Sequence, residues 1–363
     1  MIFIIYGCIY LKLCLTVDNI YNLFYITIFV FLIYLYFMNK FHFLLAALIV
    51  QTSFAQSYKK SEPLVHTYSI VAMDSITGDM GVAVQSHWFS VGTSVVYGEA
   101  GVGVVATQSL VNPIYGPKGL ALMKQGLTAQ QSLDALTEND TGEMYRQVAM
   151  LNAKGEIAAH TGSSCIDMAG DRQGKNFSVQ ANMMLNNTVW DAMATAFETT
   201  KGTIAERLLA SLKAAENEKG DIRGKQSAAI LIVSGTATGN SWEDRLMDLR
   251  VEDHKNPLEE LERLMKIHKA YDYMNKGDLA MEDGDSKLAE NLYLEAQNLF
   301  PENLEMKYWY AVNLLSNKEI DKALPILKSI FKEDKNWQVL IPRLVKSKLL
   351  SISEKDLKEV MKL

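Results

Sequence analysis

Two runs of small and β-branched residues constrain the fold more than any other feature of the chain. They are AGVGVVATQ at residues 100–108 and QSAAILIV at residues 226–233, and both are nearly unbroken by polar positions. Strands of this kind are buried on both faces, as happens when a sheet has a second sheet on one side and helices on the other. The runs therefore favour an α+β fold, a four-layer αββα sandwich, over a sheet that is open on one face.

The region from residue 64 to about residue 255 alternates between strand and helix signals. Residues 74–78 and 152–155 predict hairpin turns, because each ends in a glycine where the backbone needs a positive φ. Thr128 and Thr203 are suited to the N-cap positions of two helices. We expect strands at residues 67–73, 79–86, 101–108, 146–151, 156–160, 177–183, 226–233 and 247–252, and helices at residues 117–126, 128–139, 187–200 and 203–217.

The composition changes near residue 255, and we expect a second, all-α domain at residues 257–350. Leu, Lys and Glu dominate there at helical spacing, and Asn256 followed by Pro257 is typical of a helix start. The two domains predicted from the change are residues 64–255 and residues 257–350.

An internal repeat runs through this helical region. Windows at residues 270–303 and 304–337 bring small residues into register, with Gly277 opposite Ala311 and Ala289 opposite Ala323. The pattern resembles the tetratricopeptide repeat, in which two helices pack closely and stacked repeats form a groove for a protein partner. Helices at residues 257–268 and 338–348 would cap the pair. A generic pair of helical hairpins is the alternative.

Residues 1–55 have the character of a targeting segment. A basic stretch after Met38, an apolar stretch at residues 43–50 and small residues up to Ala55 follow one another in the order of a secretory signal peptide. We expect the chain to start at Met38, to be cut after Ala55, and to be exported to the periplasm or secreted. The alternative is a membrane anchor at residues 21–37, and this segment is the only membrane contact that we expect.

The charge and the cysteines limit the kinds of partner. The chain has 36 Lys and Arg against 42 Asp and Glu, a net charge of −6, and no basic stripe, which argues against nucleic acid. Cleavage after Ala55 would leave Cys165 as the one cysteine, so no internal disulfide is expected. The histidines form no HExxH motif, so we expect no metal and no cofactor. A metal-dependent protease is the third alternative for the function.

Five sequence blocks in one order carry a resemblance to a known family. They are TYSIVAMDSITGDMGVAVQS, AGVGVVATQSLVNPIYGPKGL, HTGSSC, GDIRGKQSAAILIV and DLRVEDH, and they span residues 67–255. Together they resemble the DUF1028 family of bacterial proteins. The resemblance implies the N-terminal-nucleophile (Ntn) hydrolase fold, which agrees with the strand pattern, but it brings no settled activity.

The Ntn fold implies that Thr67 is the nucleophile of an amide or peptide-bond hydrolase. In such enzymes the first residue attacks the amide and its own free α-amine is the base. Thr67 lies 11 residues beyond the expected cut after Ala55, so the His66–Thr67 bond must also be cleaved. The alternative is a non-enzymatic module on the same fold, which binds an amide-like or peptide-like ligand while its helical repeats recruit a protein partner.

Polar residues at the ends of the expected strands complete the candidate site. Side-chain amides could donate to an oxyanion, and the candidates are Gln108, Asn112 and Gln226. A ligand that enters at the same edge could contact Ser86, His87, His160, Asp221, Arg223 and Ser227. The alternative is that these side chains bind loop backbone and stabilise turns. A homo-oligomer is compatible with the sequence.

Overall fold

The computed structural model describes Thr27, Phe29, Leu32 and residues 64–363. The predicted start at Met38, the signal peptide and the cut after Ala55 lie outside the described residues. The residues from 64 onward belong to one compact unit. In the part of the chain that the structure describes, no helix combines the length and the apolarity that crossing a membrane requires.

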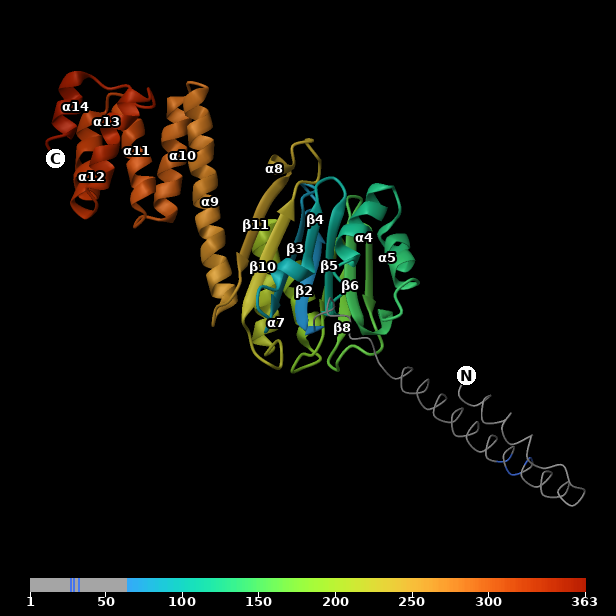
Figure 1. The fold of residues 1–363 in the computed structure, drawn as a ribbon. Coiled ribbons are helices and arrows are strands. Elements are labelled where there is room, and N and C mark those ends of the chain that lie inside the picture. Colours follow the sequence, from blue (N-terminus) through green and yellow to red (C-terminus); the bar gives the residue numbers. More distant parts are fainter. Residues whose placement is uncertain (1–26, 28, 30–31, 33–63) are drawn as a thin grey trace, which may run out of the picture. The chain divides into compact units, whose positions relative to one another are not determined.

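Two antiparallel sheets form the body of the chain up to β11, so the α+β class is confirmed (Figure 1). The first sheet has the order β1-β5-β6-β7, with β4 also paired to β5, and the second has the order β11-β10-β3-β2-β9-β8. The strands are β1 (Leu64–Val65), β2 (Thr67–Met73), β3 (Met80–Ser86), β4 (Val96–Glu99), β5 (Gly103–Leu110), β6 (Arg146–Asn152), β7 (Ile157–Thr161), β8 (Gly170–Gly174), β9 (Phe177–Ala181), β10 (Ser227–Val233) and β11 (Arg245–Val251).

Helices cover the outer face of each sheet. On the first sheet, α4 (Tyr115–Lys124) and α5 (Ala129–Thr137) pack against β5, β6 and β7. On the second sheet, α6 (Val189–Thr199) and α7 (Ile204–Asn217) pack against β2, β3, β8 and β9. The short helices α3 (Gly92–Val95), η2 (Glu143–Tyr145) and α8 (Ser241–Asp244) lie in connections.

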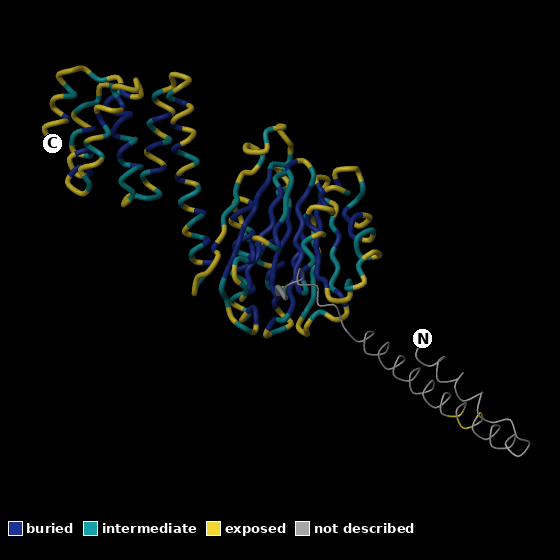
Figure 2. Tube along the Cα trace, viewed as in Figure 1, coloured by how far each residue is buried: buried dark blue, intermediate teal, exposed yellow. Residues whose placement is uncertain are grey.

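Three apolar layers hold these elements together, and the strands carry most of the buried positions (Figure 2). Val71 and Val104 belong to the layer between the two sheets. Ile70 packs with the helices over the second sheet, and Val105 packs with those over the first. Neighbouring residues of β2 and of β5 thus face opposite apolar layers, which is why their sequences do not alternate.

The turn and cap predictions are confirmed by the backbone geometry. Gly78 and Gly155 both have φ of +78° in the hairpin turns. Thr128 and Thr203 both form capping boxes, in which the threonine hydroxyl accepts from the backbone of the third helical residue. Gly103 permits the close approach of β5 and β6, because a Cβ at this position would lie 2.4 Å from the Leu151 carbonyl oxygen.

The strands and helices expected at residues 64–255 all occur, within a few residues of their predicted ends. Three further strands were not predicted. β1 has two residues and β4 has four, so neither is long enough to show a period. β8 reads GDRQG and has no apolar residue to signal a strand. It pairs with β9 at one edge of the second sheet, where backbone hydrogen bonds suffice.

The chain continues after β11 as a run of helices. They are α9 (Pro257–Glu282), α10 (Ser286–Leu299), α11 (Leu304–Ser316), α12 (Ile320–Glu333), α13 (Asn336–Lys346) and α14 (Glu354–Val360). Leu258, Leu261 and Met265 of α9 join the apolar layer over the second sheet. α9 packs along α10, and a Cβ at Gly277 would lie 2.8 Å from the Tyr293 ring, so the small residue predicted there does permit close packing.

One detail of the helical prediction is wrong. A separate helix at residues 257–268 does not exist, because α9 is continuous to Glu282 and no Gly, Pro or capping residue interrupts it near residue 269. Asn256 is the N-cap residue, as predicted, although its side chain makes no capping hydrogen bond. Pro257 at the first helical position is as predicted.

Candidate functional site

Thr67 is the first residue of β2, which lies between β3 and β9 in the second sheet. It is fully buried, and its carbonyl oxygen accepts hydrogen bonds from the backbone N–H of Asn182 at 3.1 Å and from Gln108 Nε2 at 3.2 Å. In the strand register Thr67 lies opposite Ser86 of β3, and Ser86 lies opposite Ser227 of β10. Three hydroxyl residues therefore form one row across three neighbouring strands.

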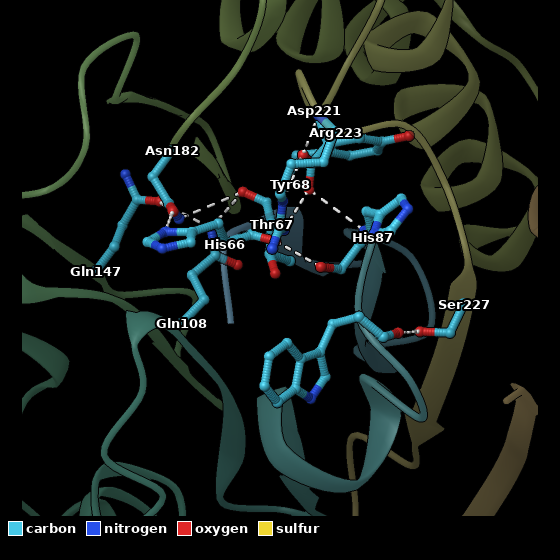
Figure 3. A network of polar contacts seen from close by, with 12 residues as sticks. His66, Thr67, Tyr68, His87, Gln108, Gln147, Asn182, Asp221, Arg223 and Ser227 are labelled. Atoms are coloured by element: carbon cyan, nitrogen blue, oxygen red, sulfur yellow. Dashed lines mark hydrogen bonds and ion pairs between the residues drawn. The ribbon is translucent and has the colours of Figure 1, made fainter. Parts of the chain in front are cut away.

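The carbonyl group of His66, directly before Thr67, has two strong donors (Figure 3). Ser86 Oγ donates to its oxygen at 2.5 Å, and Arg223 Nη2 donates to the same oxygen at 2.7 Å. A hydroxyl and a guanidinium on one carbonyl oxygen withdraw electron density from its carbon and stabilise negative charge on the oxygen.

Asp221 holds Arg223 in this position. Its Oδ1 accepts from Arg223 Nε and from the Arg223 backbone, both at 3.0 Å, and its Oδ2 accepts from Arg223 Nη2 at 2.6 Å. Oδ2 also accepts from the backbone N–H of His87 at 3.3 Å. The Asp221 side chain is fully buried, whereas that of Arg223 is 25% exposed. The carboxylate therefore fixes the direction in which the guanidinium points.

The His66 ring is also buried, and its Nδ1 lies 2.9 Å from Asn182 Oδ1. Burial lowers the pKa of His66, and the charge of Arg223 lowers it further, while the bond to Asn182 and the charge of Asp221 oppose the shift. The imidazole is therefore neutral at pH 7.

A chain of side-chain amides runs between the two sheets beside Thr67. Gln108 Nε2 donates to Gln147 Oε1 at 2.7 Å, and Asn182 Nδ2 donates to the same oxygen at 2.9 Å. Ser69 Oγ donates to Gln108 Oε1 and accepts from Gln180 Nε2, both at 2.6 Å. The members come from strands of both sheets, so the network ties the sheets together at the site.

Several predicted site residues meet at this point, and others do not. The residues that meet are Thr67, Ser86, Gln108, Asp221 and Arg223. His87 joins them through its backbone N–H, and its side chain is exposed. Ser227 lies one strand further on, where its hydroxyl contacts the Trp88 carbonyl and the Val91 backbone N–H. Three side chains bind elsewhere: Asn112 Nδ2 donates to Asp140, Gln226 Nε2 donates to Asp253, and His160 contacts Glu143.

These contacts revise the predicted oxyanion donors. The amides of Asn112 and Gln226 are engaged away from Thr67, and Gln108 donates to the carbonyl of Thr67 itself. Ser86 and Arg223 instead donate to the carbonyl oxygen of His66, the residue before Thr67. Two polar partners, Asn182 and Gln147, escaped the sequence analysis, although both stand at ends of expected strands, the signal that selected the others.

Other features of the described residues lie apart from this cluster. No group of three or more His, Cys, Asp or Glu side chains among them could hold a metal ion. Burial raises the pKa of the Cys165 thiol, which donates to the Arg146 carbonyl at 3.4 Å. A cavity of about 740 Å³ is lined by Tyr97, Arg245 and Arg250 among others, but by none of the predicted site residues.

The fold and the site define a class: α+β proteins with two antiparallel sheets and a buried threonine at the start of a central strand. The chain belongs to the DUF1028 family, whose model, described as a family of unknown function, matches residues 67–261.

Two solved structures are similar to this chain. The crystal structure of a DUF1028 protein from Silicibacter pomeroyi is 32% identical, with a TM-score of 0.51, and the match covers 55% of this chain and 85% of that one. Anbu, the ancestral β-subunit from Yersinia bercovieri, is 10% identical with a TM-score of 0.27, and that match covers 60% of this chain and 97% of the other. No curated protein matches the chain.

Proposed function

We propose that the chain is an exported amide or peptide-bond hydrolase of the Ntn type, with the αββα sandwich of that class, and that it becomes active by cutting its own His66–Thr67 bond. One observation carries the proposal: the carbonyl of the bond to be cut accepts from both Ser86 and Arg223. Polar groups placed around a carbonyl where negative charge develops are the main source of catalysis in acyl transfer.

The self-cleavage proceeds in two steps. The Thr67 hydroxyl oxygen attacks the His66 carbonyl carbon, and Ser86 and Arg223 stabilise the negative charge on the oxygen. The carbon–nitrogen bond then breaks, the hydroxyl proton goes to the Thr67 nitrogen, and an ester joins His66 to the threonine oxygen. Water hydrolyses the ester, which leaves a carboxylate on His66 and a free amine and hydroxyl on Thr67.

The same groups then act on a substrate. The free α-amine of Thr67 takes the proton from its own hydroxyl, whose oxygen attacks the substrate carbonyl carbon, and the amine passes the proton to the leaving nitrogen as the amide bond breaks. The acyl group is then joined to the Thr67 oxygen as an ester, and water hydrolyses this ester to release the acid and restore the hydroxyl. The substrate carbonyl oxygen takes the place that the His66 carbonyl has left. Asp221 is a positioning residue, because it acts through Arg223.

The mass of the purified full chain tests this proposal. We expect the wild-type chain to be cut between His66 and Thr67, Thr67→Ser to be cut as well, and Thr67→Ala to remain whole. Thr195→Ala, an exposed threonine of α6, is the matched control and should be cut like the wild type. The cut chain should hydrolyse members of a fluorogenic amide library. Amide hydrolysis by a chain that keeps the His66–Thr67 bond would overturn the mechanism.

A non-enzymatic binding module is the second candidate. The observation that favours it is that Thr67 is fully buried and joined to His66. A chain that stays whole and hydrolyses no amide in the library would support this candidate over the hydrolase.

A further inference from the structure

The segment before Thr67 forms a strand on the first sheet, although Thr67 itself begins a strand of the second. Leu64 and Val65 make β1, which pairs antiparallel with β5, Leu64 opposite Leu110 and Val65 opposite Ser109. One edge of β5 is taken by β6, so β1 shares the other edge with β4, which pairs further along at residues 103–106 of β5. The last residues before the scissile bond thus lie as an added strand, as extended peptides do in β-augmentation.

The backbone of β5 is unusual at this contact. Ser109 has φ of +73°, a left-handed conformation that residues with a side chain rarely adopt, and it is 2% exposed. It is the partner of Val65 in the strand register. Backbone strain of this kind clusters at ligand-binding sites, where the surrounding structure maintains it.

The side chain of His66 is buried against an oriented hydrogen-bond partner. Asn182 Nδ2 donates to Gln147 Oε1 at 2.9 Å, so the Asn182 oxygen is the atom that faces His66 Nδ1 at 2.9 Å. Gln147 is itself fixed, because its Nε2 donates to the Ala181 carbonyl at 2.9 Å and to Thr161 Oγ1 at 3.0 Å. Asn182 therefore presents an oriented acceptor, and His66 is its donor.

We propose that residues 64–66 occupy the acyl side of the substrate groove, so that the substrate is an extended peptide that pairs with β5 at Ser109 and Leu110 and places a hydrogen-bond-donating side chain against Asn182. This inference rests on the proposed hydrolase function and names its substrate class. The residue before the scissile bond is His, or another side chain with a donor at the same reach. We call residues 64–66 the leader. Until the His66–Thr67 bond is cut, the leader blocks the substrate groove of its own chain.

Peptide substrates test the inference on the full chain that has been left to cut itself. The substrates are acetyl-Leu-Val-Xaa fluorogenic amides in which Xaa is His, Asn, Phe or Leu. We expect His to exceed Phe by about 100-fold in kcat/KM, since a site built around a polar contact rejects a ring that lacks the donor. N-methylation of the peptide at Leu or Val should lower kcat/KM at one of these two positions, because an antiparallel pair bonds through alternate residues.

The leader itself is a second substrate, and it needs no added ligand. In the full chain, His66→Phe should slow the cut at Thr67, and His66→Asn, which keeps a donor, should be cut faster than His66→Phe. Hydrolysis with equal rates for His and Phe, or with no effect of either N-methylation, would overturn this inference and leave the proposed hydrolase intact. A chain that neither cuts itself nor hydrolyses any amide would overturn the hydrolase and this inference with it.

Discussion

Arg223 donates a 2.7 Å hydrogen bond to the carbonyl oxygen of His66, although 157 positions separate the two residues along the chain. The same Nη2 lies 2.6 Å from Asp221 Oδ2, so a buried carboxylate sets the position of the donor. The bond joins the loop before β10 to the last residue of the leader. It also brings a positive charge to the one carbonyl whose bond must break to free Thr67.

Replacement of Arg223 should slow the cut at Thr67. In Arg223→Met we expect the rate of His66–Thr67 cleavage, followed by mass, to fall about 10²- to 10³-fold, since one of two oxyanion donors is lost. Arg223→Lys should be intermediate, because an ammonium cannot bind Asp221 with a fork and reach His66 as well. Arg172→Met, which removes a half-buried arginine of β8, is the control and should cut at the wild-type rate. Equal rates in all four chains would contradict the role of Arg223.

The partly buried Asp140–Arg146 ion pair should make the stability of the fold depend on pH. Burial alone would raise the pKa of Asp140, but hydrogen bonds from Arg146 and from the Gly142 backbone outweigh it and lower the pKa to about 2 from its usual 3.8. A lowered folded-state pKa stabilises the protein above the unfolded value, and that contribution disappears as the pH falls through the folded value.

The test is the free energy of unfolding in urea as a function of pH. Asp140→Asn should cost about 2 kcal/mol at pH 7. The difference from the wild type should shrink between about pH 4 and pH 2. Asp134→Asn, at an exposed carboxylate in α5, is the control. A difference that stays constant down to pH 2 would refute the role of this carboxylate.

The amide network should be costly to interrupt. Gln108→Leu preserves the size of the side chain but removes partners from Ser69, from Gln147 and from the Thr67 carbonyl. A buried polar group that loses its partner costs roughly 1–3 kcal/mol, so we expect a loss of about 3 kcal/mol in urea unfolding. Gln125→Leu, at an exposed position after α4, should change stability by about 0.5 kcal/mol or less. A Gln108→Leu chain as stable as this control would mean that the network does not stabilise the fold.

The cap of α7 offers a local test of the helix over the second sheet. Thr203→Ala removes the hydroxyl that accepts from the Glu206 backbone, and it should cost about 1 kcal/mol. Thr199→Ala, at an exposed position near the end of α6, serves as the control, because its hydroxyl bonds a carbonyl of its own helix and caps nothing. Thermal unfolding of both variants measures the difference, and equal midpoints would show that the capping box is dispensable.

Much of the fold could be predicted because its signals are local. The runs at residues 100–108 and 226–233 predicted strands buried on both faces, and Thr128 and Thr203 predicted their helix starts. β8 could not be predicted, because its polar residues form a strand only through pairing with β9. The continuity of α9 past residue 268 was missed because the repeat window imposed a break that no residue enforces.

The candidate site was predictable only in part, and for a physical reason. A polar residue at a strand end signals a place where a ligand can enter, and this rule found Ser86, Asp221 and Arg223. It could not choose among side-chain amides, because the partner of each is set by which strands become neighbours. Gln108 and Gln147 meet across β5 and β6, whereas Gln226 turns to Asp253 after β11.

The network of side-chain amides between the two sheets limits how the sheets can move relative to each other. Dispersion contacts between apolar layers have no strongly preferred direction, whereas hydrogen bonds weaken steeply with changes of angle. Gln108 and Gln147 belong to one sheet and Ser69 to the other, so any slip of one layer over the other breaks directional bonds. These hydrogen bonds therefore fix the position of one sheet relative to the other, and the polar side chains that the two sheets contribute keep the same spacing around Thr67.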